Sequence, residues 1–444
     1  MNTLAATRDS STGHLPGTGE LTFGGRLRSI FSGSVGNLVE YFDWYVYAAF
    51  SLYFAPKFFP AGDQTAQLMN TAAVFAIGFL VRPLGGWLLG SYADRKGRKA
   101  ALLVSVMLMC FGSLLIACIP GYDVIGFWAP ALLLLARLLQ GISLGGEYGS
   151  SATYISEMAT PNRRGFYSSF QYVTIIMGQL LALGLLILLQ KVFLTQEQLA
   201  EWGWRIPFFL GAVIALLAVW MRRNMAETES FSEHRASSKR HSNLRELARH
   251  PRAVMTVVAL TAGGTVSFYT FTTYMQKYLV NTTGFSKDDA TLISSIALLV
   301  FMLLQPLVGL ISDFIGRRLM LILFGLGATL FTVPLLTALA AKQSMGSALT
   351  WYLLALVITT GYTSINAIFK AELFPVHIRA LGVGFPFAVT VSVFGGTAEY
   401  LALWLKSIGH ESWFYYYVSA CAAMSLIVAL CMRDTKAHSQ IDRD

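Results

Sequence analysis

The sequence predicts an all-α membrane protein with twelve transmembrane helices in two related halves. Of its 444 residues, 55% are hydrophobic and only 13% are charged, roughly half the charged share of a soluble domain. A helix that crosses a bilayer needs about 20 mostly apolar residues, and stretches of that length recur along the whole chain. A polar loop motif also occurs twice, at corresponding places in the two halves.

The apolar stretches give the position of each helix. The expected helices cover 29–55, 66–92, 99–119, 129–157, 164–190, 204–222, 253–280, 289–313, 318–341, 348–372, 379–405 and 412–432. Five parts of the chain follow from them: a tail over 1–28, a six-helix bundle over 29–222, a linker over 223–252, a second six-helix bundle over 253–432 and a short tail over 433–444. The first tail has no apolar core of the kind a signal peptide needs.

Positive charge is concentrated in every second connection between helices. These connections hold Arg95, Lys96, Arg98 and Lys99; Arg163 and Arg164; the linker; Arg317 and Arg318; and Arg379. The opposite connections carry isolated basic residues, Lys277 among them. An excess of Lys and Arg marks the cytoplasmic side of a membrane protein. We therefore expect both termini in the cytoplasm, and the net charge of +9 requires no nucleic-acid partner.

Two pairs of motifs relate the halves. Gly90, Asp94, Gly97 and Arg98 follow the pattern G-x-x-x-D-x-x-G-R, which returns as Gly309, Asp313, Gly316 and Arg317. Glu157 precedes Arg164 by seven residues, and Glu372 precedes Arg379 by seven. Both pairs repeat at nearly the same offset along the chain. Internal repeats of this kind are typical of secondary transporters.

The motif residues predict a cytoplasmic gate. A carboxylate at a helix end can receive an Arg from a neighbouring helix, and glycine lets the short loop turn tightly. The proposed gate residues are Asp94, Arg98, Glu157, Arg164, Asp313, Arg317, Glu372 and Arg379. The alternative is that these loops are basic anchors, but anchoring requires neither the Asp nor the Gly.

These loops resemble the signature of the major facilitator superfamily. The helix around Gly36, Asn37, Glu40, Tyr41 and Asp43 resembles the first helix of its metabolite:proton symporter family. So do the strings RPLGG from Arg82, RLLQGISLGGE from Arg137 and ELFP from Glu372. The resemblance implies the major facilitator fold, with two pseudo-symmetric six-helix bundles around a central cavity. It also implies a bacterial inner-membrane symporter that works by alternating access.

Ionisable residues at membrane depth mark the expected functional site. Each costs about 2.5–3.5 kcal/mol on insertion scales, so none should face lipid. They are Glu40, Asp43, Arg82, Arg137, Glu147, Lys370, Glu372 and Glu399.

Asp43 is the expected proton acceptor. In proton-coupled sugar and phosphate porters of the superfamily, a comparable first-helix Asp takes the proton, and in the sugar porters it can pair with a fourth-helix Arg. The resemblance puts Asp43 and Arg137 in these roles. Burial favours a neutral carboxyl group and a nearby Arg favours a charged one, so the gap between them would control protonation. A permanent ion pair is the alternative, and Glu40 and Glu147 are then the next proton acceptors.

The resemblance is closest to family members that carry 2-oxoglutarate, a dianion with two carboxylates and a keto group. Such a ligand needs cationic donors in a mostly apolar pocket, and Arg matches a carboxylate with two hydrogen bonds. Arg82 is the first choice, followed by Arg137 and Lys370, although Lys370 could instead pair with Glu372 at the gate. Gln171, Tyr269 and Tyr274 are candidate neutral donors, and interhelical packing is the alternative role of each.

Particular sequence features leave some other functions open and count against others. Related carriers of citrate or shikimate share most of these motifs. An osmoprotectant carrier would usually add a long charged C-terminal coiled coil, which the tail over 433–444 is too short to form. A membrane-embedded enzyme is not supported, because the seven His form no metal-ligand pair and no phosphate-binding glycine loop or nucleophile elbow is present.

We expect no metal and no cofactor, protons as the coupling ion, an organic-anion substrate, a lipid bilayer as surroundings and a functional monomer.

Overall fold

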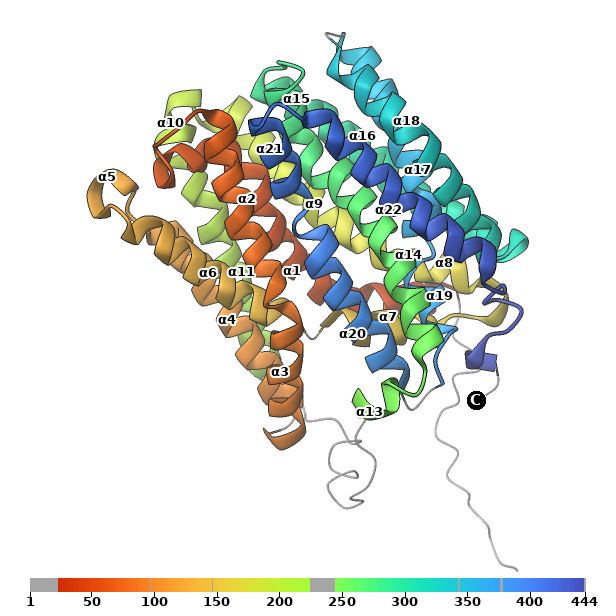
Figure 1. Cartoon of the computed structure of the whole chain (residues 1–444). Coiled ribbons are helices and arrows are strands. Elements are labelled where there is room, and N and C mark those ends of the chain that lie inside the picture. The colour runs from red at the N-terminus through yellow and green to blue at the C-terminus, as the bar shows by residue number, and fades with distance from the viewer. Residues whose placement is uncertain are drawn as a thin grey trace, which may run out of the picture.

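The computed structural model describes residues 23–96, 98–145, 147–223, 244–341, 344–375 and 378–442. Each of the twelve predicted membrane segments corresponds to one long helix or to a helix with short breaks. Figure 1 shows the two halves side by side, with the first half in red to yellow-green and the second in green to blue. The predicted all-α, two-bundle fold is confirmed.

The first half holds six membrane segments. They are formed by α1 (Phe23–Phe58); α2 (Gln64–Leu80) with α3 (Arg82–Lys96); α4 (Arg98–Cys118); α6 (Trp128–Leu144) with α7 (Glu147–Met158); α8 (Arg164–Ser168) with α9 (Phe170–Leu188) and η3 (Leu189–Phe193); and α11 (Ile206–Arg223). Two short helices, α5 (Tyr122–Ile125) and α10 (Gln196–Glu201), connect them at one end.

The second half repeats this order. Its segments are α14 (Pro251–Tyr269) with η5 (Thr270–Tyr274) and α15 (Met275–Asn281); α16 (Lys287–Ile315); α17 (Arg317–Ala340); α18 (Met345–Thr363) with α19 (Asn366–Ala371); α20 (Arg379–Thr390) with η7 (Val391–Gly395) and α21 (Ala398–Ser407); and α22 (Glu411–Cys431). The short helix α13 (Leu244–Leu247) precedes them, and η8 (Gln440–Asp442) follows.

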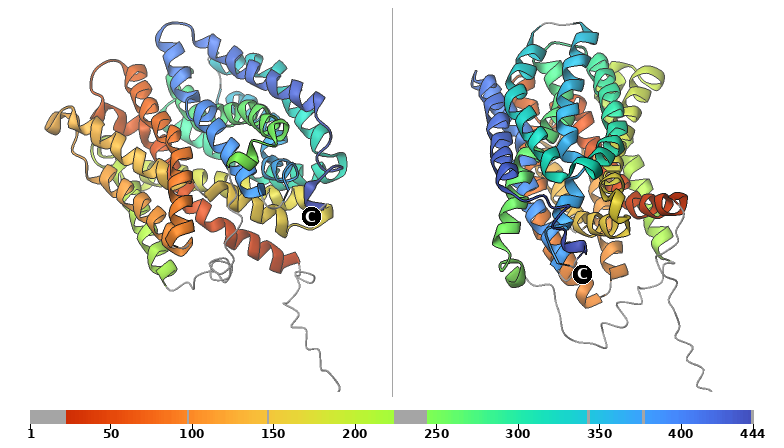
Figure 2. Two further views of the ribbon diagram at one scale, coloured as in Figure 1. Left: turned by 60° about the horizontal axis from the view of Figure 1, so that its bottom comes forward. Right: turned by 90° about the vertical axis from the view of Figure 1, so that its right-hand side faces the viewer.

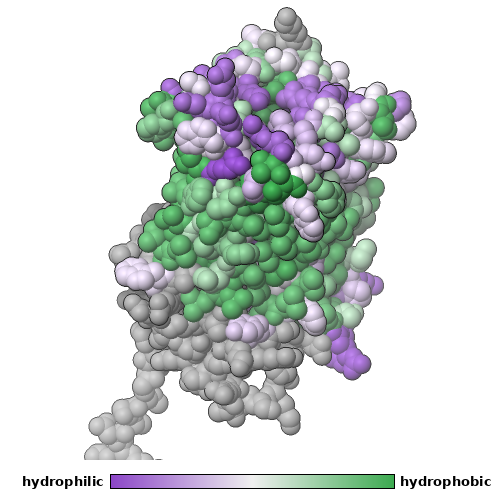
Figure 3. All heavy atoms as spheres, turned by 90° about the vertical axis from the view of Figure 1, so that its left-hand side faces the viewer, coloured by the Kyte–Doolittle hydropathy of each residue, from purple (hydrophilic) through white to green (hydrophobic). Residues whose placement is uncertain are grey.

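An apolar belt surrounds the helices. Among the described residues, eight helical segments are long and apolar enough to cross a membrane, and three shorter apolar helices accompany them. Large hydrophobic side chains such as Trp220, Leu303 and Phe314 are exposed on the outer faces of these helices. Figure 3 shows the belt as a green band below a polar cap. Because this much apolar surface is stable only in lipid, the chain is a multi-pass membrane protein.

The two ends of the molecule are named here by their place in Figure 1. The lower end holds α13, the start of α20 and the C-terminal residues, and the upper end holds α10 and the end of α15. Figure 2 shows the C-terminal residues at the lower end from two further directions. Most of the predicted linker over 223–252 and of the tail over 1–28 lies outside the described residues.

The halves approach closely through glycine. A Cβ atom on Gly149 of α7 would lie 2.7 Å from the Cα of Gly384 on α20. A Cβ on Gly309 of α16 would lie 2.6 Å from the carbonyl oxygen of Gly165 on α8. Real Cβ atoms do not come so near, so only glycine permits these contacts. The first glycine of the second G-x-x-x-D-x-x-G-R motif therefore serves packing between the halves.

A proline creates another link between the halves. Pro83 has no backbone N–H, so the carbonyl oxygen of Phe79 loses its normal helical donor, and the helix breaks at Val81 between α2 and α3. The hydroxyl group of Ser392, in η7 of the other half, donates a hydrogen bond to this oxygen at 2.6 Å. The break also places Arg82 at the first position of α3.

Candidate functional site

Asp43 lies inside the first half, on α1, and is fully surrounded by neighbouring helices. Its carboxylate accepts hydrogen bonds from Ser113 of α4 at 2.5 Å and from the side-chain amide of Gln140 of α6 at 2.7 Å. A Cβ atom on Gly211 of α11 would lie 2.4 Å from the same carboxylate, so glycine makes room for it. Glu40, one helical turn earlier, is also buried.

Arg137 is linked to Asp43 through Gln140. The guanidinium group of Arg137 donates to the side-chain oxygen of Gln140 at 2.7 Å, and Gln140 in turn donates to Asp43. The direct Asp43–Arg137 ion pair considered from the sequence is not formed. Gln140 follows Arg137 by three residues in the motif RLLQG, and a side chain at i+3 lies on the same helical face.

Aromatic rings enclose Arg137. Its guanidinium carbon lies 3.7 Å from the ring centre of Trp44 and 4.3 Å from that of Tyr47. The side chain is 0% exposed, and two of its nitrogen atoms have no hydrogen-bond partner. Cation–π contacts with desolvated rings contribute about 2 kcal/mol, less than a carboxylate would contribute. Arg137 is therefore buried with unused donors.

Arg82 lies beside the same aromatic cluster. Its guanidinium carbon is 4.8 Å from the ring centre of Phe79 and 5.5 Å from that of Trp44. The hydroxyl group of Tyr269, from α14 of the other half, lies within hydrogen-bonding reach of Arg82. The structure thus brings together two residues that the sequence predicted for one ligand.

Lys370 comes from the second half, on α19. Its ammonium nitrogen lies 3.8 Å from the ring centre of Phe387 and 5.4 Å from that of Tyr148. The side chain is 0% exposed, and its nitrogen has no hydrogen-bond partner. Lys370 does not pair with Glu372 in this structure, so the gate-pair alternative remains a prediction.

Asn366 lies one turn before Lys370 and adds polar groups from both halves. Its amide donates to the hydroxyl oxygen of Tyr148 at 3.0 Å and to that of Tyr172 at 2.7 Å, while its own oxygen accepts no hydrogen bond. Gln171 is buried on α9, where its oxygen accepts a hydrogen bond from Ser151 and its amide nitrogen is unpartnered. These groups could serve a polar ligand.

Tyr274 lies apart from this cluster. It packs against Phe414 of α22 and Tyr278 of α15, with ring centres 5.8 and 5.9 Å away, and its buried hydroxyl group has no partner. Its surroundings are those of a packing residue of the second half, the alternative role that we expected for it from the sequence.

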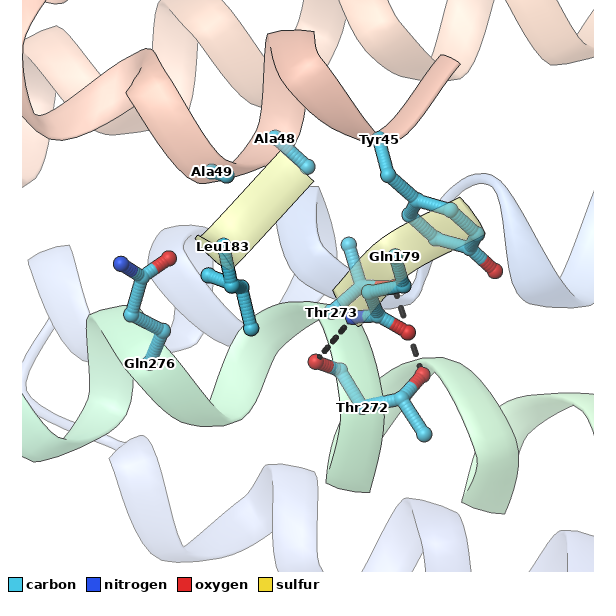
Figure 4. Close-up of a pocket in the computed structure, with 8 residues that line it drawn as sticks. All are labelled: Tyr45, Ala48, Ala49, Gln179, Leu183, Thr272, Thr273 and Gln276. Atoms are coloured by element: carbon cyan, nitrogen blue, oxygen red, sulfur yellow. Dashed lines mark hydrogen bonds between the residues drawn. The ribbon is translucent and has the colours of Figure 1, made fainter. Parts of the chain in front are cut away.

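The expected central cavity is almost closed. A pocket of about 10 Å³ lies between the halves, lined by Tyr45, Ala48 and Ala49 of α1, Gln179 and Leu183 of α9, and Thr272, Thr273 and Gln276. Figure 4 shows the polar side chains of α9 and η5 directed toward one another below α1. The amide of Gln179 donates to the carbonyl oxygen of Thr272 at 2.7 Å. This volume holds about one water molecule, so a substrate requires the halves to separate.

Several of the predicted gate residues lie together at the lower end, where the two halves meet. Asp313 of α16 accepts hydrogen bonds from the backbone N–H groups of Gly165 and Phe166 in the first half, at 2.8 and 2.9 Å. Arg317 pairs with Asp313 at 2.9 Å and with Glu372 at 3.6 Å. Asp313 thus joins the two halves directly, as a carboxylate at the N-terminal turn of a helix.

The structure describes the side chains of only some of the remaining gate residues. Arg164 is buried close to Glu372, and Arg379 donates to the carbonyl oxygen of Phe374 at 3.2 Å. The side chains of Asp94, Arg98, Glu147 and Glu157 lie outside the described residues.

The C-terminal residues pack on this gate, a contact that the sequence did not predict. Thr435 donates to the carboxylate of Glu372 at 2.6 Å, and the backbone N–H of Gln440 donates to the carbonyl oxygen of Glu372 at 2.9 Å. Asp434 accepts from the backbone N–H of Arg318 at 3.1 Å. The polar composition of 433–444 suggested a tail, and polarity alone does not reveal such pairing.

The two halves also meet at the upper end. Lys287 donates to the carbonyl oxygen of Leu52 at 2.8 Å, and Lys191 pairs with Asp288 at 2.5 Å. Asn281 donates to the hydroxyl oxygen of Thr65 at 3.2 Å. Each of these contacts joins the first half to the second, so the described residues of the two halves meet at both ends.

Lys277 corrects the sequence interpretation. It was counted among the isolated basic residues of the connections, but it lies within α15, 1% exposed, and pairs with Glu399 of α21 at 2.8 Å. The apolar pattern could not distinguish a connection from a buried helix end that carries one charge. Glu399, recognised as a buried charge, gave the signal that a cationic partner was needed.

A membrane protein of two six-helix bundles, with charged side chains buried between and within them, is a solute carrier. The model of the sugar (and other) transporter family matches residues 30–231 and 221–443. The chain therefore belongs to the sugar (and other) transporter family, within the major facilitator superfamily.

The chain also resembles individual carriers. The chain is 56% identical to the alpha-ketoglutarate permease of Escherichia coli K12, over 92% of this chain and 94% of the permease. It is 35% identical to a citrate-proton symporter of Salmonella typhi, over 94% of this chain and 96% of that one. A partially occluded, inward-open structure of the xylose transporter of E. coli matches with a TM-score of 0.72 at 19% identity, over 92% of this chain and 97% of that chain, which supports the fold alone.

Proposed function

We propose that this protein takes up 2-oxoglutarate together with protons across a bacterial inner membrane by alternating access. One observation carries the proposal: three cationic side chains, Arg82, Arg137 and Lys370, are buried without an ion pair to any carboxylate among the described residues. Buried cations without such partners are costly. An anionic substrate would supply the missing charge.

The distribution of the three cations suits a substrate with two carboxylates. Arg82 and Arg137 belong to the first half and Lys370 to the second. A dicarboxylate bound by both halves would stabilise the occluded state more than a monocarboxylate, because it neutralises charges on both sides of the pocket. Tyr269 and Gln171, whose amide nitrogen has no partner among the described residues, are the neutral donors that we assign to the keto oxygen or to the remaining carboxylate oxygens.

Asp43 is the proposed proton acceptor, and Gln140 transmits its state. While Asp43 is charged, Gln140 holds it and the donors of Arg137 in one network. A protonated Asp43 leaves Arg137 without a nearby negative charge, so Arg137 then binds a substrate carboxylate more strongly. Proton binding and substrate binding thereby reinforce each other. Glu40 and Glu147 remain the next candidates for the proton.

Proton coupling also lowers the electrical cost of bringing a dianion into the cell. Entry of a dianion into a cell that is negative inside costs about 4.6 kcal/mol per 100 mV, since each charge contributes roughly 2.3 kcal/mol. One proton halves this cost and two remove it. The alternating-access cycle then requires the gate of Asp313, Arg317, Glu372 and Arg379 to open at the lower end, with Asp94, Arg98, Glu157 and Arg164 as its partners in the first half. We assign this end and both termini to the cytoplasm, and a monomer as the working unit.

Uptake into proteoliposomes tests the function. With an imposed pH gradient, acidic outside, we expect labelled 2-oxoglutarate to accumulate, and a protonophore to abolish the accumulation. Unlabelled citrate and shikimate should compete weakly. Stronger competition by citrate than by unlabelled 2-oxoglutarate would instead assign the protein to the activity named for its citrate-proton relative. Uptake that ignores the proton gradient would contradict the proposal.

A further inference from the structure

The Lys277–Glu399 pair is a buried charge pair that the proposed mechanism leaves unused. Lys277 is 1% exposed and Glu399 5% exposed, and their charged atoms lie 2.8 Å apart. Replacing such a pair by apolar side chains is often neutral or stabilising. Its presence at membrane depth therefore points to a function rather than to stability.

The surroundings of the pair connect it to the substrate pocket. Lys277 lies one turn after Thr273, a pocket-lining residue, and residues four apart share a helical face. Both partners stand next to π-helical turns, η5 before Lys277 and η7 before Glu399. Such turns are frequent at functional sites. The other titratable groups that face Glu399 are the hydroxyl groups of Tyr47 on α1 and Tyr274 in η5.

The position of the pair along the membrane differs from that of Lys370. Lys277 precedes by one turn Asn281, which joins Thr65 at the upper closure, whereas Lys370 lies two residues before Glu372 of the lower gate. The second half thus holds one buried lysine nearer to each end of the molecule. Tyr47 of the first half, which faces Glu399, also has its ring centre 4.3 Å from the guanidinium carbon of Arg137.

We propose that Lys277 is an upper subsite that one substrate carboxylate occupies on entry, before the two carboxylates reach Arg82, Arg137 and Lys370, and that Glu399 blocks this subsite while it is charged. When Glu399 takes a proton from the upper side, the ion pair is lost and the ammonium group of Lys277 remains charged. A carboxylate of the substrate then replaces that of Glu399. No bond other than that to the proton changes, and one negative charge takes the place of another. The subsite rests on the proposed function, because it requires an anionic substrate.

The predicted signature is a pH-dependent half-saturation that survives loss of Asp43. Substrate exchange, which needs no net proton movement, is measured in proteoliposomes with 2-oxoglutarate as the probe. In Asp43→Asn, the half-saturation concentration on the upper side should fall at least several-fold from mildly alkaline to mildly acidic pH. In Asp43→Asn with Glu399→Gln, it should stay low and flat across that range. A pH dependence that persists in the second variant overturns the proposal.

A variant in which both residues of the pair are neutral gives a second test, in case Glu399→Gln alone prevents folding. Lys277→Gln with Glu399→Gln leaves no unpaired charge, so it should fold, and the proposal expects a half-saturation raised about tenfold or more at every pH. Wild-type half-saturation in this variant would make the pair purely structural and overturn the proposal. Glu411→Gln is the matched control, because Glu411 pairs with Lys406 at 3.3 Å at the upper end, away from the pocket lining. If wild-type protein does not exchange 2-oxoglutarate at all, the proposed function fails rather than the subsite.

Discussion

At the scale of single residues, aromatic rings take the place of counterions. Trp44, Phe79 and Phe387 lie against Arg137, Arg82 and Lys370. A ring face attracts a cation without neutralising it. The three cations therefore keep their charge available while no substrate is bound, which a carboxylate partner would prevent.

Replacing Arg82 tests the proposed ligand contact. A hydrogen bond to a charged group contributes about 1.5–3 kcal/mol, so Arg82→Ala should raise the half-saturation for 2-oxoglutarate about ten- to hundredfold. Uptake at several substrate concentrations measures this, with membrane levels checked. Arg205→Ala is the control, because Arg205 also lies over a Trp ring, 4.1 Å from the centre of Trp204, but at the upper end. Equal effects of the two variants would contradict a ligand role for Arg82.

Replacing Asp43 separates coupling from binding. Asp43→Asn retains a side chain that can bond to Ser113 and Gln140 but cannot exchange a proton near neutral pH. We expect exchange of labelled for unlabelled 2-oxoglutarate to persist and accumulation driven by a pH gradient to be lost. If Asp43→Asn still accumulates substrate, the proton belongs to another residue, with Glu40 and Glu147 to be tested next.

The sequence predicted some of these residues and missed others. Asp43, Arg82, Arg137 and Lys370 stand out because a charge is expensive at membrane depth. Gln140 and Asn366 carry no charge, so their role as connectors follows only from three-dimensional distances. The sequence interpretation placed Lys277 in a connection between helices, because a charge near a helix end fits a connection as well as a buried position.

At the scale of helices and loops, the lower gate depends on one carboxylate that reaches across the halves. Asp313 holds two backbone N–H groups of the first half while its own Arg317 holds it in place. The repeated motif predicted the importance of this loop. It did not predict that the carboxylate would bind backbone groups, because helix N-terminal turns carry no residue-specific signal.

Weakening this contact should open the lower end more often. In a cysteine-free background, Ser151→Cys reports access to the pocket from below, since Ser151 bonds to Gln171. Adding Asp313→Asn removes hydrogen bonds to a charge worth about 1.5–3 kcal/mol, so labelling by a membrane-impermeant thiol reagent from the lower side should become about tenfold faster or more. Asp288→Asn, which weakens the upper pair with Lys191, serves as the control and should not accelerate it. Unchanged labelling in Asp313→Asn would contradict the gate.

The C-terminal residues should stabilise the same gate from outside. Thr435→Ala removes the donor to Glu372 and leaves a buried carboxylate oxygen unpaired, at a cost of about 1–3 kcal/mol. The melting temperature of the purified protein should fall by several degrees. Thr350→Ala is the control, because Thr350 bonds to Gly346 within its own helix. Equal melting temperatures for wild type and Thr435→Ala would show that the contact carries no stability.

Helix bounds were predictable, and most helix breaks were not. The twelve segments lie within six residues of the expected ranges because length and apolarity decide membrane spans. The break at Val81 follows from Pro83, but the π-helical turns η5 and η7 have no such signal in the sequence. Residues of these breaks also find partners in the other half, as Ser392 does with Phe79. A pattern read along one segment contains no information about such partners.

At the scale of the whole molecule, contacts between the described residues of the two halves hold both ends together. Close glycine contacts and the Asp313 contacts join the halves at the lower end, and Lys287 and the Lys191–Asp288 pair join them at the upper end. The pocket left between them is too small for an organic acid. The buried charges predicted a charged chamber between the halves, but none of them lines the small pocket that the described residues form there. The sequence could not predict its volume, because volume depends on how far the two halves have moved apart.

The central claim is that cations from both halves bind one dicarboxylate. The most direct test is a structure of the protein with 2-oxoglutarate bound and both ends closed. One carboxylate should lie about 3 Å from the guanidinium groups of Arg82 or Arg137, and the other about 3 Å from the ammonium group of Lys370. A ligand that contacts neither arginine, or lies outside the region between the bundles, would contradict the account.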